Sequence, residues 1–112
     1  GIGTTPTNSP DYRLFVENGI VCRDVLVKLG AWPDFVFQPN YGLMPLSELR
    51  SYLSQNQHLP GIPSAKELEA KDGVEVGEMQ RRMLQVVEEQ ALYILELEER
   101  LSAVEQEIRT RK

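Results

Sequence analysis

The chain has one histidine, His58, which lies in the Pro/Gly-rich stretch "HLPGIPSA" (58–65) close to the Ser64 hydroxyl. A serine beside an imidazole base is one arrangement that supports nucleophilic catalysis, provided that a third group orients the base. No Asp or Glu lies within five residues of His58. Ser64 is also followed three positions later by Glu67, a spacing typical of a helix N-cap. We therefore interpret both residues as parts of a structural corner between two helices.

The remaining candidates for chemistry do not converge. Asp24, Asp34 and Asp72 lie in unlike local contexts, so paired catalytic carboxylates and a metal-ligand cluster are disfavoured. The single Cys22 rules out an intrachain disulfide and a cysteine metal site, and its strand-like surroundings indicate a half-buried thiol. We expect no catalytic residue, no bound cofactor and no metal ion, and therefore no enzyme.

Size and charge exclude further classes of function. The chain has 112 residues, a net charge of −5 and 41% hydrophobic residues, which suits one folded domain. The acidic balance gives little support for binding a phosphate backbone, so no nucleic acid partner is expected. No run of 18 apolar residues is present, so no membrane insertion is expected. Because the sequence opens on Gly-Ile-Gly-Thr-Thr without a signal peptide, we expect a C-terminal fragment of a longer protein.

The first part of the chain has strand and turn signals. Residues 1–12 are rich in Gly, Thr and Pro and predict an extended lead-in. In the following segment, Asn18-Gly19 is the strongest short hairpin signal because both residues tolerate positive φ. We therefore predict a β-hairpin within residues 13–40. Four apolar residues after the turn share one face of the second strand: Val21, Val25, Val27 and Leu29.

Residues 30–40, "GAWPDFVFQPN", form an aromatic-rich loop between two prolines. Two interpretations stay open for it. The loop is either a hydrophobic plug that docks on the helices, or an exposed surface on which a ligand stacks. The candidate docking or partner-binding residues are Trp32, Phe35, Phe37 and Tyr41.

From residue 41 to 75 the pattern changes to short helices. Leu46, Leu49 and Leu53 recur at helical spacing behind Pro45, which suits a first helical turn. A second short helix is expected after Ser64 and should end near Asp72-Gly73.

Residues 76–112 predict one long helix with a seven-residue repeat. Eight of the ten a and d positions are apolar over more than four heptads, which is typical of a coiled coil. The rival interpretation is a single amphipathic helix that packs only on its own chain. The a positions are Gln80, Val87, Ile94, Leu101 and Ile108, and the d positions are Val76, Met83, Gln90, Leu97 and Val104.

The two halves of this helix differ. Beyond Leu97 only a and d are apolar, whereas before it the apolar surface also includes e and g positions such as Leu84 and Val86. The first half should therefore be wrapped by other elements as well as by partner helices. Gln90 is a polar layer that either fixes register or tolerates partial exposure. The expected oligomer interface consists of Met83, Val87, Gln90, Ile94, Leu97, Leu101, Val104 and Ile108.

Several phrases occur in a characteristic order: "GIGTTPT", "WPDFVF", "HLPGIPSAKE" and "GEMQRRMLQVVEEQALYILELEERL". Together they resemble the C-terminal module of large surface or tail-fibre-like proteins, especially those of Bacteroidetes-type bacteria. The resemblance covers nearly the whole chain, with Gln90-Ala91 standing where that family often has Leu-Thr. It implies a fibrous, homotrimeric parent located outside the cell, on the cell surface or on a phage or tail-like particle. Residues 1–12 would then end a repeat of the fibre shaft.

The expected fold class is α+β, with an N-terminal β-hairpin, an aromatic loop, two short helices and a long helix in a parallel, trimeric coiled coil. We hypothesise a non-catalytic trimerisation and registration module whose partner is the same chain. Two alternatives stay open: a binding module at the tip of a fibre, with an unknown surface ligand held by the aromatic loop, and a dimeric coiled-coil adaptor. The heptads alone do not separate three strands from two.

Overall fold

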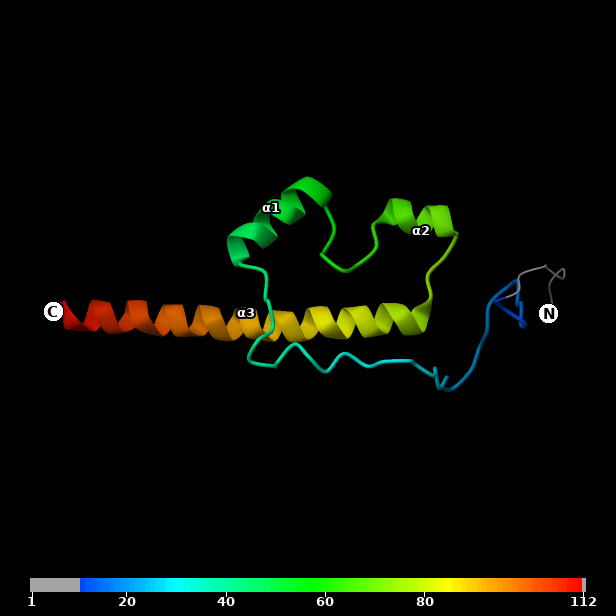
Figure 1. The fold of residues 1–112 in the computed structure, drawn as a ribbon, viewed down its shortest axis with the longest axis horizontal. Coiled ribbons are helices and arrows are strands. Elements are labelled where there is room, and N and C mark those ends of the chain that lie inside the picture. Colours follow the sequence, from blue (N-terminus) through cyan, green and yellow to red (C-terminus); the bar gives the residue numbers. More distant parts are fainter. Residues whose placement is uncertain (1–10, 112) are drawn as a thin grey trace.

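A computed structural model describes residues 11–111, which form an extended molecule around one long helix (Figure 1). Three helices are present in this range: α1 (Leu46–Asn56), α2 (Ala65–Lys71) and α3 (Val76–Thr110). The molecule measures 74 × 31 × 27 Å, and its radius of gyration is 20.8 Å. A compact chain of this size would have a radius of gyration of about 13 Å. The single chain is therefore far from globular.

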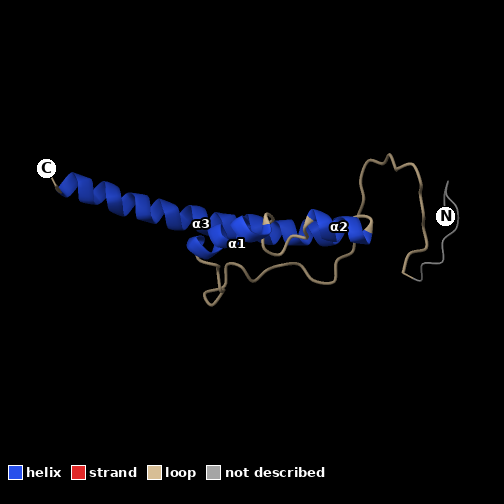
Figure 2. Ribbon diagram, turned by 90° about the horizontal axis from the view of Figure 1, so that it is seen from above, coloured by secondary structure: helices blue, strands red, loops and turns tan. Residues whose placement is uncertain are grey.

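The expected α+β fold class is wrong. Residues 11–111 contain no β-strand, and the segment that carries Asn18-Gly19 is irregular chain rather than a hairpin (Figure 2). Gly19 does adopt a positive φ of 104°, so the turn signal acts locally. Two strands of this length need a surface to pack on, and here Val21 and Leu26 are 103% and 92% exposed. The expected extended lead-in, residues 1–12, lies almost entirely outside the described residues.

Helix α2 begins and ends on local signals. Ser64 is the N-cap of α2, and its hydroxyl accepts a 3.1 Å hydrogen bond from the backbone N–H of Glu67, which confirms the predicted cap. The helix closes at Asp72, which has a φ of 58°, while the Gly73 N–H donates to the Leu68 carbonyl at 3.1 Å. This pairing is a Schellman motif, and it turns the chain back toward α3.

Three segments run along α3. Residues 27–44, here called the strap, follow the helix in the same direction, on the side away from α1 and α2 (Figure 1). Helices α1 and α2 then return in the opposite direction. They are joined by residues 58–64, here called the corner. The last part of α3 projects beyond these segments, and every described residue from Ile94 onward is exposed.

The chain buries very little of itself. Pro33 and Val36, both in the strap, are the only buried residues in the described range. The chain exposes 9895 Å² of surface, whereas about 6,200 Å² is expected for a compact monomer of this mass. Because apolar burial is the main stabilising contribution to folding, a single copy lacks the core that usually holds a domain together.

Candidate functional site

The strap crosses α3 at Gly77. A Cβ atom at this position would lie 2.5 Å from the Val27 Cγ1 atom and 3.2 Å from the Leu29 Cδ2 atom. Real Cβ atoms do not approach other carbons this closely, so the crossing requires glycine. Gly77 occupies an e position of the heptad, and the strap therefore begins on the e side of α3.

The strap is held further along α3 by Tyr41. Its hydroxyl donates a 2.6 Å hydrogen bond to Glu89 Oε2 and accepts one of 3.2 Å from Gln85 Nε2. Both partners lie on the side of α3 far from the a and d positions. Burial and the hydrogen bond to Glu89 raise the pKa of the Tyr41 hydroxyl, so it stays protonated and able to donate.

The strap then reaches the g side of α3. There the Tyr93 hydroxyl donates a 2.5 Å hydrogen bond to the Met44 carbonyl. A small cavity between the two layers is lined by Met44, Leu49 and Leu59 from one side and by Val86 and Tyr93 from α3. Val86 and Tyr93 are both g residues, so α1 and the corner cover the g side.

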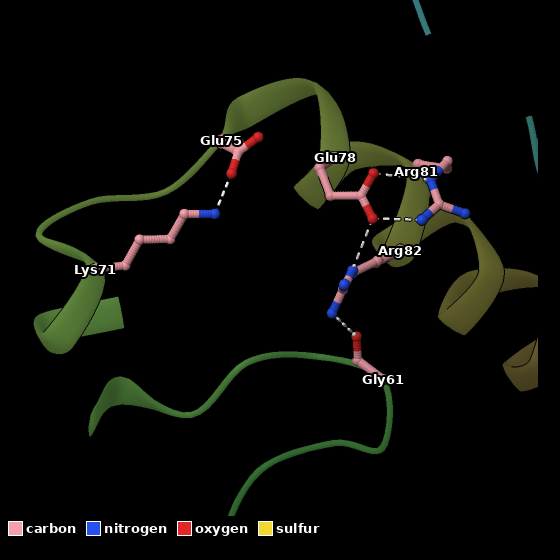
Figure 3. A network of polar contacts seen from close by, with 6 residues as sticks. All are labelled: Gly61, Lys71, Glu75, Glu78, Arg81 and Arg82. Carbon is pink, nitrogen blue, oxygen red and sulfur yellow. Dashed lines mark hydrogen bonds and ion pairs between the residues drawn. The ribbon is translucent and has the colours of Figure 1, made fainter. Parts of the chain in front are cut away.

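Arg82 connects α3 to the corner (Figure 3). One terminal nitrogen of its guanidinium donates a 3.1 Å hydrogen bond to the Gly61 carbonyl, while its Nε donates one of 3.0 Å to Glu78. Glu78 also accepts two hydrogen bonds from Arg81, the one from Nε at 3.0 Å. These bonds from Arg81 and Arg82 lower the pKa of Glu78 to about 2, from an ordinary value of 4.5.

Between Gly77 and Tyr93, the intrachain contacts therefore cover the flanks and the far side of α3 but not the heptad seam, which is the stripe of a and d residues. Before Ile94, all six e and g residues are half-buried. By contrast, all ten a and d residues are exposed, and the eight apolar ones among them are between 50% and 66% exposed. The half-buried e and g residues are Gly77, Met79, Leu84, Val86, Ala91 and Tyr93.

The expected oligomer interface lies on this uncovered face. Met83 (52%), Ile94 (66%) and Leu101 (58%) illustrate its exposure, and Gln90 is exposed with them. The full set shares one stripe of α3: Met83, Val87, Gln90, Ile94, Leu97, Leu101, Val104 and Ile108.

The four candidate aromatic residues of the strap differ in their exposure. Tyr41 is half-buried and bonded to α3, whereas Trp32, Phe35 and Phe37 are 56%, 43% and 60% exposed. Phe35 also contacts the Tyr41 ring, with the ring centroids 5.8 Å apart. The strap thus docks through Pro33, Val36 and Tyr41 and turns its large aromatic rings outward.

The corner residues make structural contacts only. His58 Nδ1 lies 3.0 Å from the Leu59 carbonyl, and its ring meets the Tyr52 ring edge-on at 5.6 Å between centroids. A carbonyl only accepts, so this hydrogen bond requires the proton on Nδ1. The Ser64 hydroxyl contacts Glu67 rather than His58. No carboxylate of the described residues forms a hydrogen bond with His58 either. The structure therefore does not bring His58 and Ser64 together as a catalytic pair.

Three further features concern the described residues. No group of three or more His, Cys, Asp or Glu side chains in this range is placed to hold a metal ion. Cys22 is exposed rather than half-buried as expected. Within residues 11–111, no helix is long and apolar enough to cross a membrane.

No family model, curated protein or solved structure matches this chain.

Sequence reasoning missed the residues that hold the layers on α3. Gly77, Gln85 and Glu89 had no assigned role, although a glycine at an e position of a long helix is a usable signal of close approach. Arg82 also had no assigned role, and its partner is a backbone carbonyl 21 positions away, which no spacing rule reveals.

Proposed function

We propose that this chain is a non-catalytic self-association module. Three copies of α3 pair through their a and d residues in a parallel coiled coil, which holds three chains in register at the end of a fibrous surface or tail-fibre-like protein. The observation that carries the proposal is the selective exposure of the seam. Before Ile94, the chain covers both flanks of α3 and its far side and leaves the a and d residues exposed.

The chemistry of the seam supports this use. Eight apolar side chains, each at least half exposed, form a stripe that continues for 35 residues of helix. Burying such a stripe against identical stripes removes it from water, at about 25 cal/mol per Å² of apolar surface. Every described residue of α3 from Ile94 onward is exposed, so a helix partner is the main source of stability for this part of the helix.

The number and direction of strands rest on the same ground. Three strands and an extracellular location follow from the resemblance to tail-fibre-like proteins. A parallel arrangement also follows from that resemblance, because chains that continue from one fibre shaft enter the module at the same end. In that arrangement, Arg100 at a g position and Glu105 at the next e position face each other across neighbouring helices. In the single chain Arg100 pairs instead with Glu96 at 3.9 Å.

The mass of the chain in solution tests the proposal. Sedimentation equilibrium should give the mass of three chains of 12.7 kDa each. The double variant Ile94→Asp/Leu101→Asp should reduce this to one chain, because a carboxylate in the seam has no partner. A matched variant, Ser102→Asp/Gln106→Asp, introduces two carboxylates at exposed positions outside the seam and should keep the mass. A single-chain mass for the unaltered protein would contradict self-association, and a two-chain mass would contradict the trimer.

One observation favours a second candidate. The exposure of Trp32, Phe35 and Phe37 is what a ligand-binding tip would require. A binding module and a self-association module are compatible only if these rings stay exposed once copies assemble.

A further inference from the structure

The strap has one buried face and one exposed face. Pro33 and Val36 are buried against the chain, while Trp32 and Phe37 on the same short segment are 56% and 60% exposed. A turn fixes this arrangement, because the Gln38 N–H donates to the Phe35 carbonyl at 3.2 Å. The backbone turn therefore helps to hold the exposed aromatic rings in place.

The two flanks of α3 carry different elements. The strap enters on the e side, where Val27 meets Gly77. The corner and α2 lie toward the g side, where a hollow is lined by Pro63, Leu68 and Val74 and closed by Met79 of α3. A single copy is therefore asymmetric across its own seam.

A parallel coiled coil brings these unlike flanks together, because the e side of each helix lies beside the g side of its neighbour. The strap and the returning chain also lie beside the same stretch of α3. Between Gly77 and Glu89 the strap runs from Val27 to Tyr41. Over the same stretch of α3 the returning chain covers the opposite flank, with its Gly61 carbonyl bonded to Arg82.

We propose that the exposed aromatic face of each strap docks on the corner and α2 of the neighbouring copy. This inference rests on the proposed function, since it requires a parallel seam. The receiving surface has the right chemistry for aromatic rings. Leu59 and Val74 are 36% and 49% exposed there, and Arg82 lines the hollow together with Val74. Apolar side chains and a cation both favour an aromatic partner. The second copy thus completes an outer layer around the coil.

Trp32 is the only tryptophan in the chain, so its fluorescence reports on this contact alone. In the assembled protein, Trp32 emission should shift to shorter wavelength and acrylamide quenching should weaken, relative to the single-chain variant Ile94→Asp/Leu101→Asp. Equal quenching in an assembly of confirmed three-chain mass would overturn the inference and leave the proposed function standing. The rings would then be free for a foreign ligand.

Cross-linking identifies the receiving surface. A benzoylphenylalanine placed at Phe37 is irradiated in a mixture of ¹⁵N-labelled and unlabelled chains, and linked peptides are sequenced by mass spectrometry. Mixed-isotope links from Phe37 to residues 59–74 are expected. Links to the strap of another copy, with none to residues 59–74, would overturn the inference. A one-chain mass in the same sample would overturn both the inference and the proposed function.

Discussion

The Tyr41 hydroxyl donates a 2.6 Å hydrogen bond to Glu89, a residue 48 positions later in the chain. This bond, the Gly77 crossing and the bond from Tyr93 to the Met44 carbonyl position the strap along α3. Between the first two points, the strap covers the side of α3 that the seam does not use. The bond from Tyr41 to Glu89 therefore holds the strap on the side of α3 opposite the seam.

Replacing Tyr41 with Phe should weaken docking of the strap. The variant keeps the ring against Phe35 but removes the hydroxyl that bonds Glu89 and Gln85. We expect a loss of about 1 kcal/mol in the free energy of unfolding, measured by urea denaturation. Tyr52→Phe is the matched control, because Tyr52 contacts His58 through its ring. Equal stability of the two variants would contradict a role for the Tyr41 hydroxyl.

Gly77→Ala should destabilise the protein although alanine favours helices. In an unobstructed helix this change would add about 1 kcal/mol of stability. Here the new Cβ would lie 2.5 Å from Val27 Cγ1, and a β-branched side chain has little freedom to move away. The double variant Val27→Ala/Gly77→Ala should recover stability relative to Val27→Ala alone. Urea denaturation of the four proteins in this cycle measures the coupling, and a more stable single Gly77→Ala variant would show that the strap does not cross here.

The low pKa of Glu78 predicts a loss of stability in acid. Its value of about 2 in the folded chain lies below the ordinary 4.5. The carboxylate therefore stabilises the fold above pH 4.5, and this contribution disappears as the pH falls toward 2. Chemical denaturation between pH 7 and pH 2.5 should show the unaltered chain losing more stability than Glu78→Gln. Glu99→Gln should behave as the unaltered chain does, since Glu99 is fully exposed on the outer face. Parallel pH profiles for all three proteins would contradict the assignment.

Gln90→Leu tests the seam at its internal polar layer. In an isolated helix the change is nearly neutral, because Leu and Gln have similar helix propensities. In an assembled coil the leucine becomes buried and should add at least about 1.5 kcal/mol per chain. We expect a higher Tm by circular dichroism, rising further with protein concentration. Gln106→Leu makes the same substitution on the outer face and should leave Tm unchanged, so an equal response of the two variants would contradict the seam assignment.

The helices were readable from local sequence because their signals are local. The capping box at Ser64 and the stop at Asp72-Gly73 each involve residues within one turn, and the structure places both as expected. The repeat from Val76 onward indicates a long helix because its period persists over many turns.

The hairpin prediction was wrong because strand pairing depends on contacts that are not local. Asn18-Gly19 specifies a turn, but a strand pair also needs a surface, and no local signal reports whether one is present. The layers on α3 are likewise invisible in the sequence, because Tyr41 and Glu89 meet only after the chain has turned back twice. The heptad pattern located the expected interface on one stripe of α3, while the assignment of its flanks to the strap and the corner required the coordinates.

The order of segments along the chain has a consequence for how the protein is made. The strap emerges from the ribosome before the surface it docks on, which extends from Gly77 to Tyr93. At about 5–20 residues per second, the strap waits several seconds without its binding surface. Its apolar residues are exposed during that interval and need protection from premature contacts. Folding of this region therefore follows translation of α3, and docking of the strap and pairing of the seam become possible at nearly the same moment.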